Sequence, residues 1–453
     1  MMEDRSASPA FPAGFRWGVS TAAYQIEGAV AEDGRGPSIW DTFAHTPGRT
    51  KNGETGDVAC DHYHRWAEDV ALMADLGIDT YRFSVAWPRV QPTGTGPANM
   101  AGLDFYDRLV DALLERDIRP LPTLFHWDLP QPLQDVGGWM NRETAYRFAE
   151  YAALTADRLG DRVKAWITLN EPVVHLTYGY AFGIHAPGEA LMFDALPGAH
   201  HLLLGHGLSV PVLRERGAEE ILISNNCTPV RAASPHPEDL AAAELYDTFH
   251  NRLYLEPILL GAYPDLSAVG VPKEPAHLEP GDLEIISARI DGLGVNYYNP
   301  TAIAAADFAA TGLPFDFREI EAATTTTMGW PVVPEGLTEL LTGLKQRYGD
   351  ALPPITITEN GCSTADEPDA DGVVHDTARI DFLDTHLGAL REAIAAGVDV
   401  RGYLVWSLLD NFEWAEGYEQ RFGLVRTDYQ TLERTPKDSY RWFQAVLAEQ
   451  KKA

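Results

Sequence analysis

Short strand-like segments and amphipathic helix-like segments alternate along the whole chain, and this alternation limits the possible folds more than any other feature of the sequence. The strand-like segments are rich in β-branched and aromatic residues, and the stretches between them repeat apolar residues every three or four positions. Regular alternation of this kind predicts right-handed β–α–β units around a parallel sheet. The eight predicted strands are residues 15–23, 80–87, 119–127, 163–170, 220–227, 292–298, 354–359 and 402–407.

Three helices can be placed from their apolar faces, and two of them end at a glycine, as helices often do. Eight strand–helix pairs predict an α/β fold whose sheet closes into a (β/α)8 TIM barrel. Because such barrels can exceed about 400 residues, we expect residues 1–453 to form a single domain, with residues 1–10 as a flexible tail. The apolar faces are Trp66, Val70, Met73 and Leu76 before Gly77; Phe105, Leu109, Ala112 and Leu113; and Ile380, Leu383, Leu387, Leu390 and Ile394 before Gly397.

An open doubly wound sheet is the alternative architecture. It is disfavoured because neither a Gly-x-Gly-x-x-Gly nor a Gly-Lys-Ser phosphate loop follows the first strand. In a barrel, the active site is built at the carboxyl ends of the strands. Long connections follow the fourth, sixth and eighth strands, so we expect functional loops around that face. These connections are residues 173–197, 301–334 and 410–436.

Two glutamates, Glu171 and Glu359, occupy matching positions at the ends of two predicted strands. Each ends an apolar run and precedes a turn signal, which is Pro172 for the first and Asn360-Gly361 for the second. A barrel would therefore bring both carboxyl groups to one face. Cleavage of a glycosidic bond needs such a pair, with one group to protonate the leaving oxygen and one to stabilise or bond to the sugar cation.

Polar and aromatic residues at the other strand ends favour a carbohydrate ligand. Sugars are bound by paired hydrogen bonds to their hydroxyl groups and by aromatic faces against their C–H surfaces. A lone glutamate at a strand end most often lies in a solvated turn or caps a helix. The interpretation therefore depends on the second glutamate and on these neighbours. The neighbours are Gln25, Glu27, Arg82, His126, Trp127, Asn296, Tyr298 and Trp406.

Five segments give the chain a resemblance, over nearly its whole length, to the β-glucosidases of glycoside hydrolase family 1. Each segment alone is moderately specific, but their order along the chain is typical of this family. The family fold is a (β/α)8 barrel, in agreement with the alternation described above. The segments are 15–28 (FRWGVSTAAYQIEG), 81–88 (YRFSVAWP), 168–172 (TLNEP), 357–361 (ITENG) and 406–414 (WSLLDNFEW).

The resemblance implies roles for the two glutamates. Glu171 would be the general acid/base and Glu359 the nucleophile, which gives a covalent glycosyl-enzyme and net retention of the anomeric configuration. This chemistry requires the two carboxyl groups to lie about 5–5.5 Å apart. It also requires Glu171 to stay protonated while Glu359 stays ionised, and we expect Arg82 and the Tyr298 hydroxyl to stabilise the charge of Glu359.

The resemblance also implies a sugar-binding pocket and an expected substrate. Trp406 would form its stacking floor, Asn170 would contact the 2-hydroxyl group, and Trp330 would stack on the leaving group. Glu413 would repel a phosphate and so favours an unphosphorylated sugar. Without the resemblance, His126 and Trp127 would be interpreted as two neighbouring side chains packed in the core. The expected substrate-binding residues are Gln25, His126, Trp127, Asn170, Asn296, Tyr298, Trp406, Glu413, Trp414 and Phe422.

The expected activity is exo-hydrolysis of terminal β-D-glucose from oligosaccharides, including those of cellulose degradation, and from aryl or alkyl glucosides. Side activity on galactose or fucose is also expected. Two alternatives remain open. One is a sugar-binding protein without catalysis, and the other is a transglycosylase in which a sugar outcompetes water. Ordinary loop packing is an equally good interpretation of four further residues of the long loops, which could instead line the entrance: His175, Tyr178, Phe182 and His185.

The amino-acid composition argues against some classes of binding partner and indicates a cellular compartment. The net charge of −31 argues against nucleic acid or an anionic membrane as a partner. The three cysteines lack disulfide spacing, and the N-terminus lacks the basic start and apolar stretch of a signal peptide, so we expect a soluble cytoplasmic protein. His62, His64 and the pair His200-His201 have no ligands at zinc-site spacing, so no metal and no cofactor are predicted.

Three smaller features are interpreted without a role in catalysis. Asn226 begins a formal glycosylation sequon, which we interpret as chance in a chain without a secretion signal. Cys362 follows Gly361 where the family more often has a small residue, so the site is expected to be sensitive to thiol reagents. Residues 366–372 are acidic and are interpreted as a surface turn.

Overall fold

A closed barrel of eight parallel strands forms the centre of the computed structural model, which describes residues 11–267 and 277–452. Around the barrel the strand order is β1-β2-β3-β4-β5-β7-β10-β11, and β1 pairs with both β2 and β11, which excludes an open sheet. The predicted tail at residues 1–10 lies outside the described residues. The barrel strands are β1 Arg16–Ser20, β2 Thr80–Ser84, β3 Arg119–Phe125, β4 Ala165–Asn170, β5 Glu220–Asn226, β7 Gly292–Asn296, β10 Ile355–Asn360 and β11 Val400–Trp406.

All eight predicted strands are confirmed, although four of them end two or three residues earlier than predicted. The reason is visible at Ala23 and Trp87, which begin the short helices α1 (Ala23–Ile26) and α4 (Trp87–Val90). The apolar run continues from each strand into its helix, so the pattern alone does not mark the boundary.

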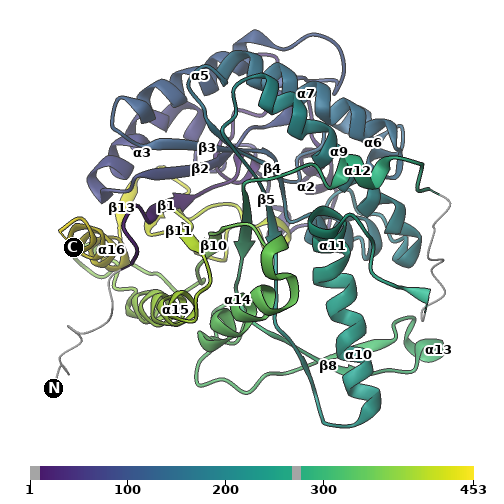
Figure 1. Cartoon of the computed structure of the whole chain (residues 1–453). Helices are drawn as coiled ribbons and strands as arrows, with labels where there is room; N and C mark the ends of the chain where they lie inside the picture. Colours follow the sequence, from purple (N-terminus) through teal and green to yellow (C-terminus); the bar gives the residue numbers. More distant parts are fainter. Residues whose placement is uncertain (1–10, 268–276, 453) are drawn as a thin grey trace.

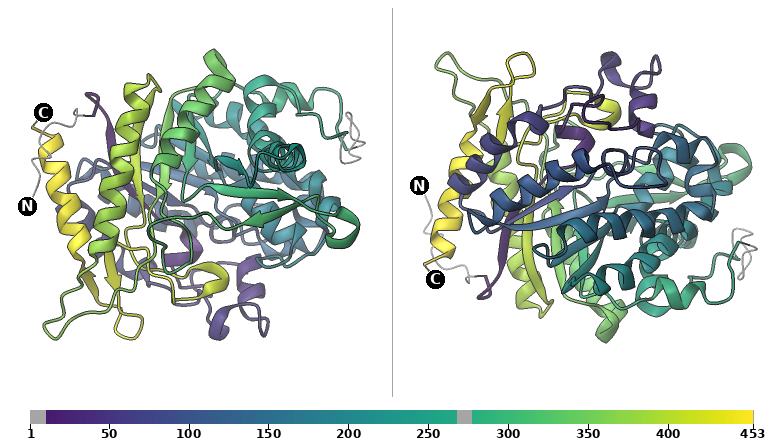
Figure 2. Two further views of the ribbon diagram at one scale, coloured as in Figure 1. Left: turned by 90° about the horizontal axis from the view of Figure 1, so that it is seen from below. Right: turned by 90° about the horizontal axis from the view of Figure 1, so that it is seen from above.

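Helices surround the barrel on the outside (Figures 1 and 2). The three helices predicted from their apolar faces are confirmed as α3, α5 and α15, and Gly77 ends α3 in the left-handed conformation that glycine adopts easily. The longer helices are α3 His62–Leu76, α5 Met100–Leu114, α7 Glu143–Leu159, α9 Leu196–Glu215, α10 Pro237–Asp247, α11 Leu253–Leu260, α14 Glu335–Tyr348, α15 Thr377–Ala395 and α16 Asp438–Gln450.

The long connections after the strands contain short elements of their own. A three-stranded sheet, β6-β8-β9, packs against α10 and extends to one side of the barrel (Figure 1). Two π-helical turns, η3 and η5, lie in the connections after β4 and β5. The short elements are α2 Ile39–Ala44, η1 Lys51–Gly53, α6 Gln131–Gln134, η2 Gly138–Met140, α8 Pro172–Val174, η3 His175–Ala181, η4 Met192–Ala195, β6 Val230–Ala232, η5 Thr248–Arg252, α12 Asp282–Ile286, β8 Thr301–Ala305, α13 Phe308–Thr311, β9 Phe315–Arg318, η7 Gly349–Ala351, η8 Trp414–Glu416, β12 Val425–Thr427 and β13 Arg434–Pro436.

A buried ion network fixes the connections that follow β10 and β11. Lys437 donates a 2.6 Å hydrogen bond to Asp410 and also contacts Asp366, which pairs with Arg379 at 2.6 Å. These four side chains are almost fully buried, and their charges balance, as a buried ion cluster requires. The interpretation of residues 366–372 as a surface turn is therefore wrong for Asp366, although Asp369 to Asp371 are exposed.

Apolar side chains fill the interior of the barrel between its strands, so the barrel is a packed core and not a channel. In the described residues, no helix is both long enough and apolar enough to cross a membrane. The buried cluster of the interior consists of Leu121, Ala165, Ile167, Leu222 and Leu404.

Candidate active site

A cavity of about 930 Å³ opens at the carboxyl ends of the barrel strands, and both strand-end glutamates line it. Its wall also contains aromatic residues from the ends of β3, β7 and β11 and from the loop that follows β11. The predicted site residues found in this wall are His126, Glu171, Tyr298, Trp330, Glu359, Trp406, Glu413, Trp414 and Phe422.

The other predicted site residues lie directly behind this wall and hold it in place. Arg82 is fully buried and pairs with Glu359. Asn170 contacts His126, and Asn296 donates to Glu171 at 2.8 Å. Two further residues complete this layer: Gln25 donates to Glu413 at 3.3 Å, and Trp127 donates to the backbone carbonyl of Asn170 at 3.0 Å.

Glu171 and Glu359 have different hydrogen-bond partners. Glu359 Oε1 pairs with Arg82 Nη1 at 2.5 Å, and its Oε2 accepts from the Tyr298 hydroxyl at 2.7 Å. Glu171 has no cation among these partners, because its Oε1 accepts only from the neutral amides of Asn226 at 3.0 Å and Asn296 at 2.8 Å. The environment therefore stabilises a negative charge on Glu359 more strongly than on Glu171.

The shifts in pKa follow from these environments. Burial, reinforced by the charge of Glu359, raises the pKa of Glu171 to about 8, and the two amide hydrogen bonds oppose the rise. Burial also raises the pKa of Glu359, but the Arg82 charge and the hydrogen bonds from Tyr298 and Arg82 oppose that rise. Arg82 and Tyr298 thus stabilise the ionised form as expected, although they do not lower the pKa of Glu359 below its ordinary value.

Arg82 also fixes the orientation of the Asn170 amide and, through it, the tautomer of His126. An arginine can only donate, so the contact of 2.5 Å from Arg82 Nη2 makes Oδ1 of Asn170 the acceptor. The Asn170 amide nitrogen then donates to His126 Nε2 at 3.0 Å. Burial keeps the pKa of His126 well below its ordinary value, so the neutral ring carries its proton on Nδ1. That N–H has no protein partner among the described residues, which suits it to a ligand hydroxyl group.

Aromatic rings pack on two sides of the cavity. Trp414 lies 4.6 Å from both Trp40 and Trp127, measured between ring centroids. On the other side, Trp330 lies 5.2 Å from Tyr298 and 6.0 Å from Phe422. The wall therefore combines flat apolar faces with hydrogen-bonding groups, which is the combination that binds sugars.

Unusual backbone conformations occur at three of the site residues. Glu171, Trp127 and Trp414 have positive φ values of 46°, 75° and 54°, in the left-handed region that non-glycine residues rarely adopt. Such conformations cost free energy and are found most often at functional sites. Gly361, two residues after Glu359, has no room for a side chain, because a Cβ would lie 1.8 Å from the carbonyl oxygen of Trp406.

Asn226 and His250 belong to the site, although neither is among the predicted site residues. Both line the cavity, and His250 Nε2 lies 3.1 Å from Asn226 Oδ1. Asn226 donates to Glu171, so its Oδ1 is the acceptor and His250 Nε2 carries the proton. Asn226 is the last residue of β5, so the strand-end rule that identified Glu171 could have identified it too.

The cysteines do not contribute to the site. All three are buried and free, and burial raises the pKa of Cys362 to about 12. A buried thiol with so high a pKa is a poor nucleophile, so the expected thiol sensitivity is not supported. Among the described residues there is no group of three or more side chains that could hold a metal ion.

The family model for glycosyl hydrolase family 1 matches residues 7–452. The chain belongs to this family. It is 47% identical to β-glucosidase A of Thermotoga maritima, over 96% of this chain and 97% of that relative, and 46% identical to the bifunctional β-D-glucosidase/β-D-fucosidase of Bifidobacterium breve, over 97% and 98%. The solved structure of the Thermotoga maritima β-glucosidase in complex with glucoimidazole superposes with a TM-score of 0.93 at 46% identity, covering 97% of this chain and 99% of that chain. The sequence-based recognition of a family 1 β-glucosidase with a TIM-barrel fold is therefore confirmed.

Proposed function

We propose that this enzyme is a retaining exo-β-glucosidase, in which Glu171 is the general acid/base and Glu359 the nucleophile. One observation carries the proposal: two buried glutamates line one cavity, and among the described residues Arg82 forms its ion pair with Glu359 and not with Glu171. A glycosidase that forms a covalent intermediate needs this asymmetry between its carboxyl groups.

In the first step, Glu359 Oε attacks the anomeric carbon while the bond from that carbon to the leaving oxygen breaks. Glu171 donates its proton to the leaving oxygen, so the aglycone departs as an alcohol. In the second step, Glu171 takes a proton from water, the water oxygen bonds to the anomeric carbon, and the Glu359 ester breaks. Each step inverts the configuration at the anomeric carbon, and the product retains it.

Glucose recognition would come from polar groups in the cavity wall and directly behind it. Gln25 Oε1 and His126 Nδ1 are buried and have no protein partner among the described residues, which suits them to sugar hydroxyl groups. Gln25 also holds Glu413, a third carboxyl group of the cavity, through a hydrogen bond of 3.3 Å. A dianionic phosphate in this cavity would be repelled by the ionised Glu359, so an unphosphorylated sugar is proposed.

The substrates proposed are cello-oligosaccharides and aryl or alkyl β-glucosides, with side activity on β-fucosides and β-galactosides. The name of the Bifidobacterium breve relative supports the fucoside activity, because it includes both glucosidase and fucosidase. A substrate panel tests the proposal, with release of 4-nitrophenol measured from the β-gluco, β-fuco, β-galacto, β-manno and 6-phospho-β-gluco glycosides. We expect the β-glucoside to be hydrolysed efficiently and the 6-phosphoglucoside to be the poorest substrate.

The same panel separates the two alternatives. If the protein binds glucose but releases no nitrophenol from any glycoside, it is a sugar-binding protein and the proposal is refuted. If nitrophenol appears without free sugar, and the products at high sugar concentration are new oligosaccharides, the enzyme is a transglycosylase. NMR of the first product also tests retention, since β-glucose must appear before mutarotation produces the α anomer.

We expect replacement of Asn226 by alanine to move the alkaline limb of the pH profile to higher pH. Activity requires protonated Glu171, so kcat/KM should fall as the pH rises past its pKa of about 8. Asn226 donates to the ionised form and so lowers that pKa. The loss of one such hydrogen bond should raise the midpoint of the alkaline limb by about half to one pH unit.

Asn225→Ala is the matched control for this experiment. Asn225 is the neighbouring residue, and its buried amide has no hydrogen-bond partner among the described residues. Its replacement should leave the alkaline limb where it is. A downward shift in Asn226→Ala, or equal shifts in both variants, would contradict the assignment of Glu171 as the group that titrates in this limb.

A further inference from the structure

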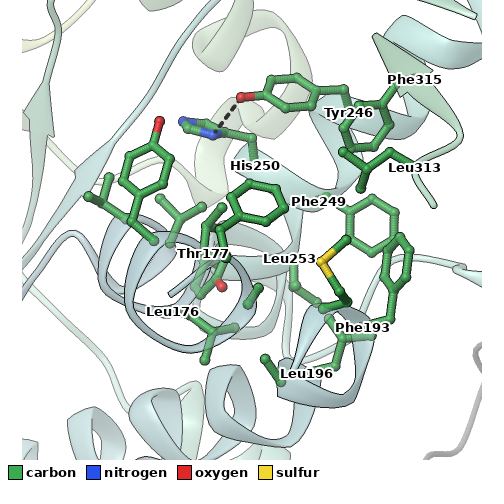
Figure 3. A pocket seen from close by; sticks show the side chains of 18 of the residues that line it. Leu176, Thr177, Phe193, Leu196, Tyr246, Phe249, His250, Leu253, Leu313 and Phe315 are labelled. Atoms are coloured by element: carbon green, nitrogen blue, oxygen red, sulfur yellow. Dashed lines mark hydrogen bonds between the residues drawn. The ribbon is translucent and has the colours of Figure 1, made fainter. Parts of the chain in front are cut away.

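A chain of hydrogen bonds leads from Glu171 through Asn226 to His250. Asn226 Nδ2 donates to Glu171 Oε1 at 3.0 Å, and His250 Nε2 donates to Asn226 Oδ1 at 3.1 Å. At the far end, the Tyr246 hydroxyl lies 3.2 Å from His250 Nδ1, a contact that Figure 3 shows as a dashed line. The carboxyl group of Glu171 is therefore connected, through a single amide, to a histidine ring.

The surrounding structure orients the imidazole ring of His250. His250 lies in the π-helical turn η5, and π-helical turns occur frequently at functional sites. The Tyr246 ring, four residues earlier, stacks on the imidazole with 5.4 Å between centroids and 23° between the planes. Burial lowers the pKa of His250 to about 4, so near neutral pH the ring is uncharged and carries one proton. The nitrogen that carries this proton determines the direction in which the chain of hydrogen bonds runs.

Both amide hydrogen bonds to Glu171 end on the same oxygen, Oε1. Asn296 donates to it at 2.8 Å and Asn226 at 3.0 Å. Among the described residues no side chain donates to Oε2, and Glu171 lines the cavity. A protonated carboxyl group has one O–H to donate, and an oxygen that already accepts two hydrogen bonds is the poorer place for that proton. The proton that Glu171 donates in the first step is therefore held on Oε2.

The two amides differ in what fixes their orientation. The Oδ1 atom of Asn296 accepts from the hydroxyl groups of Ser224 at 2.9 Å and Thr358 at 2.6 Å, so its nitrogen must face the carboxyl group. The Oδ1 atom of Asn226 has one hydrogen-bond partner in the described part of the chain, which is His250. The orientation of the Asn226 amide thus depends on the proton that His250 presents to it.

Rotation of the Asn226 amide by 180° would reverse the chain of hydrogen bonds. Oδ1 would then accept a proton carried by Glu171 Oε1, the amide nitrogen would donate to His250 Nε2, and the imidazole would carry its proton on Nδ1. Glu171 would still be protonated, but its O–H would point to Asn226 and not to a leaving oxygen. The reversed chain is an inactive form of the acid with the same net charge.

We propose that His250 is a positioning residue of the acid/base, because the proton on its Nε2 holds the Asn226 amide in the orientation that keeps the proton of Glu171 on Oε2. The inference rests on the proposed function, since it assumes that Glu171 protonates the leaving oxygen. His250 acts through Asn226 and takes no part in bond breaking. The other titratable groups that act on Glu171 stay in place in the variants below, and they are Arg82, Tyr178, Cys227, Tyr298, Glu359 and Glu413.

NMR of the imidazole tautomer tests the inference without turnover. Isotope-labelled histidine gives separate signals for Nδ1 and Nε2, and either His250→Phe or His250→Gln identifies the signals of His250 by their loss. We expect a neutral ring with its proton on Nε2 from about pH 6 to about pH 8. A proton on Nδ1 overturns the inference, whatever the activity of the enzyme.

The kinetic test compares methyl β-glucoside with 2,4-dinitrophenyl β-glucoside, whose leaving group departs without protonation. His250→Phe frees the Asn226 amide to rotate, so the ratio of kcat/KM for the methyl substrate to that for the dinitrophenyl substrate should fall about tenfold. Asn226→Ala removes the amide that rotates, so this ratio should fall less in that variant. When His250→Phe is added to Asn226→Ala, no further fall is expected, because the group through which His250 acts is gone.

Two further variants separate the hydrogen bond from the shape of the side chain. His250→Gln can place an amide N–H where Nε2 lies, so it should regain most of the ratio that His250→Phe loses. His236→Phe makes the same substitution at an exposed position before α10 and should leave the ratio unchanged. Thermal unfolding of each variant measures any loss of folding independently of the ratio.

The outcomes distinguish this inference from the proposed function. Equal losses for the two substrates in His250→Phe would show a role in folding or binding and would overturn the inference. An additional loss in the double variant would overturn it as well. If Glu171→Gln keeps full activity on methyl β-glucoside, the proposed function itself fails. If Glu171→Gln loses that activity while His250→Phe matches the parent enzyme, only the role of His250 is refuted.

Discussion

Glu359→Ala is expected to lower kcat for 4-nitrophenyl β-glucoside by a factor on the order of 10⁵ or more. In the proposed mechanism, Glu359 forms the bond that replaces the leaving group, and in the described part of the chain no other carboxyl group of the cavity forms an ion pair with an arginine. Without this nucleophile, the enzyme retains binding and proton donation but cannot form the covalent intermediate.

The loss of activity has to be distinguished from a loss of folding. Glu359→Ala leaves Arg82 buried without its carboxylate, and an unpaired buried charge destabilises a protein. Glu359→Gln keeps a carbonyl oxygen for Arg82 and is the better-folded comparison. Thermal unfolding should show both variants folded, and both should be inactive. Glu215→Ala, at an exposed position at the end of α9, should retain full activity.

Azide provides a positive test of the same assignment. In Glu359→Ala, the space left by the carboxylate can admit azide, whose terminal nitrogen bonds to the anomeric carbon as the nitrophenolate departs. Attack comes from the face that Glu359 would have used, so the product is α-glucosyl azide. We expect azide to raise the rate at least about tenfold. Full activity without azide, or β-glucosyl azide as the product, refutes the assignment of Glu359 as nucleophile.

The strand-end rule explains how much of the site could be predicted from the sequence. A polar residue after an apolar run shows which residues meet at the carboxyl face of a barrel, and it located Glu171, His126 and Tyr298 without any knowledge of their contacts. Asn226 satisfies the same rule, but its place in a glycosylation sequon led to a different interpretation. The resemblance added residues of the loop after β11, such as Glu413, which no strand pattern could identify.

The apolar pocket of Figure 3, which encloses about 110 Å³, could not be predicted in this way. Its lining comes from η3, η4, η5 and β9, which are separated by up to about one third of the chain, and no periodicity relates them. The apolar residues involved, such as Phe193 and Phe249, resemble ordinary core residues in the sequence. Whether they leave a space between them depends on the paths of the loops, which side-chain packing determines only in the folded protein.

Glu171→Gln is expected to affect substrates according to the acidity of their leaving groups. The substituted amide keeps the shape of the side chain but has no acidic proton to give, and general acid catalysis of this kind contributes about 10²–10⁴ in rate. For n-alkyl β-glucosides, kcat/KM should therefore fall by about that factor. For 2,4-dinitrophenyl β-glucoside, whose leaving group departs without protonation, kcat/KM should stay within about tenfold of the parent enzyme.

The second step of the reaction gives this variant a kinetic signature. Glu171 also activates water, so its loss slows hydrolysis of the glycosyl-enzyme, which then accumulates when the first step is fast. We expect a burst of one equivalent of dinitrophenol followed by slow turnover, and mass spectrometry should detect glucose bound to Glu359. The alkaline limb near pH 8 should also disappear from the kcat/KM profile with the nitrophenyl substrate, because the group that titrates there is gone. Equal losses for alkyl and dinitrophenyl glucosides, or no burst, would show that Glu171 is not the acid/base, and Glu215→Gln should change none of these quantities.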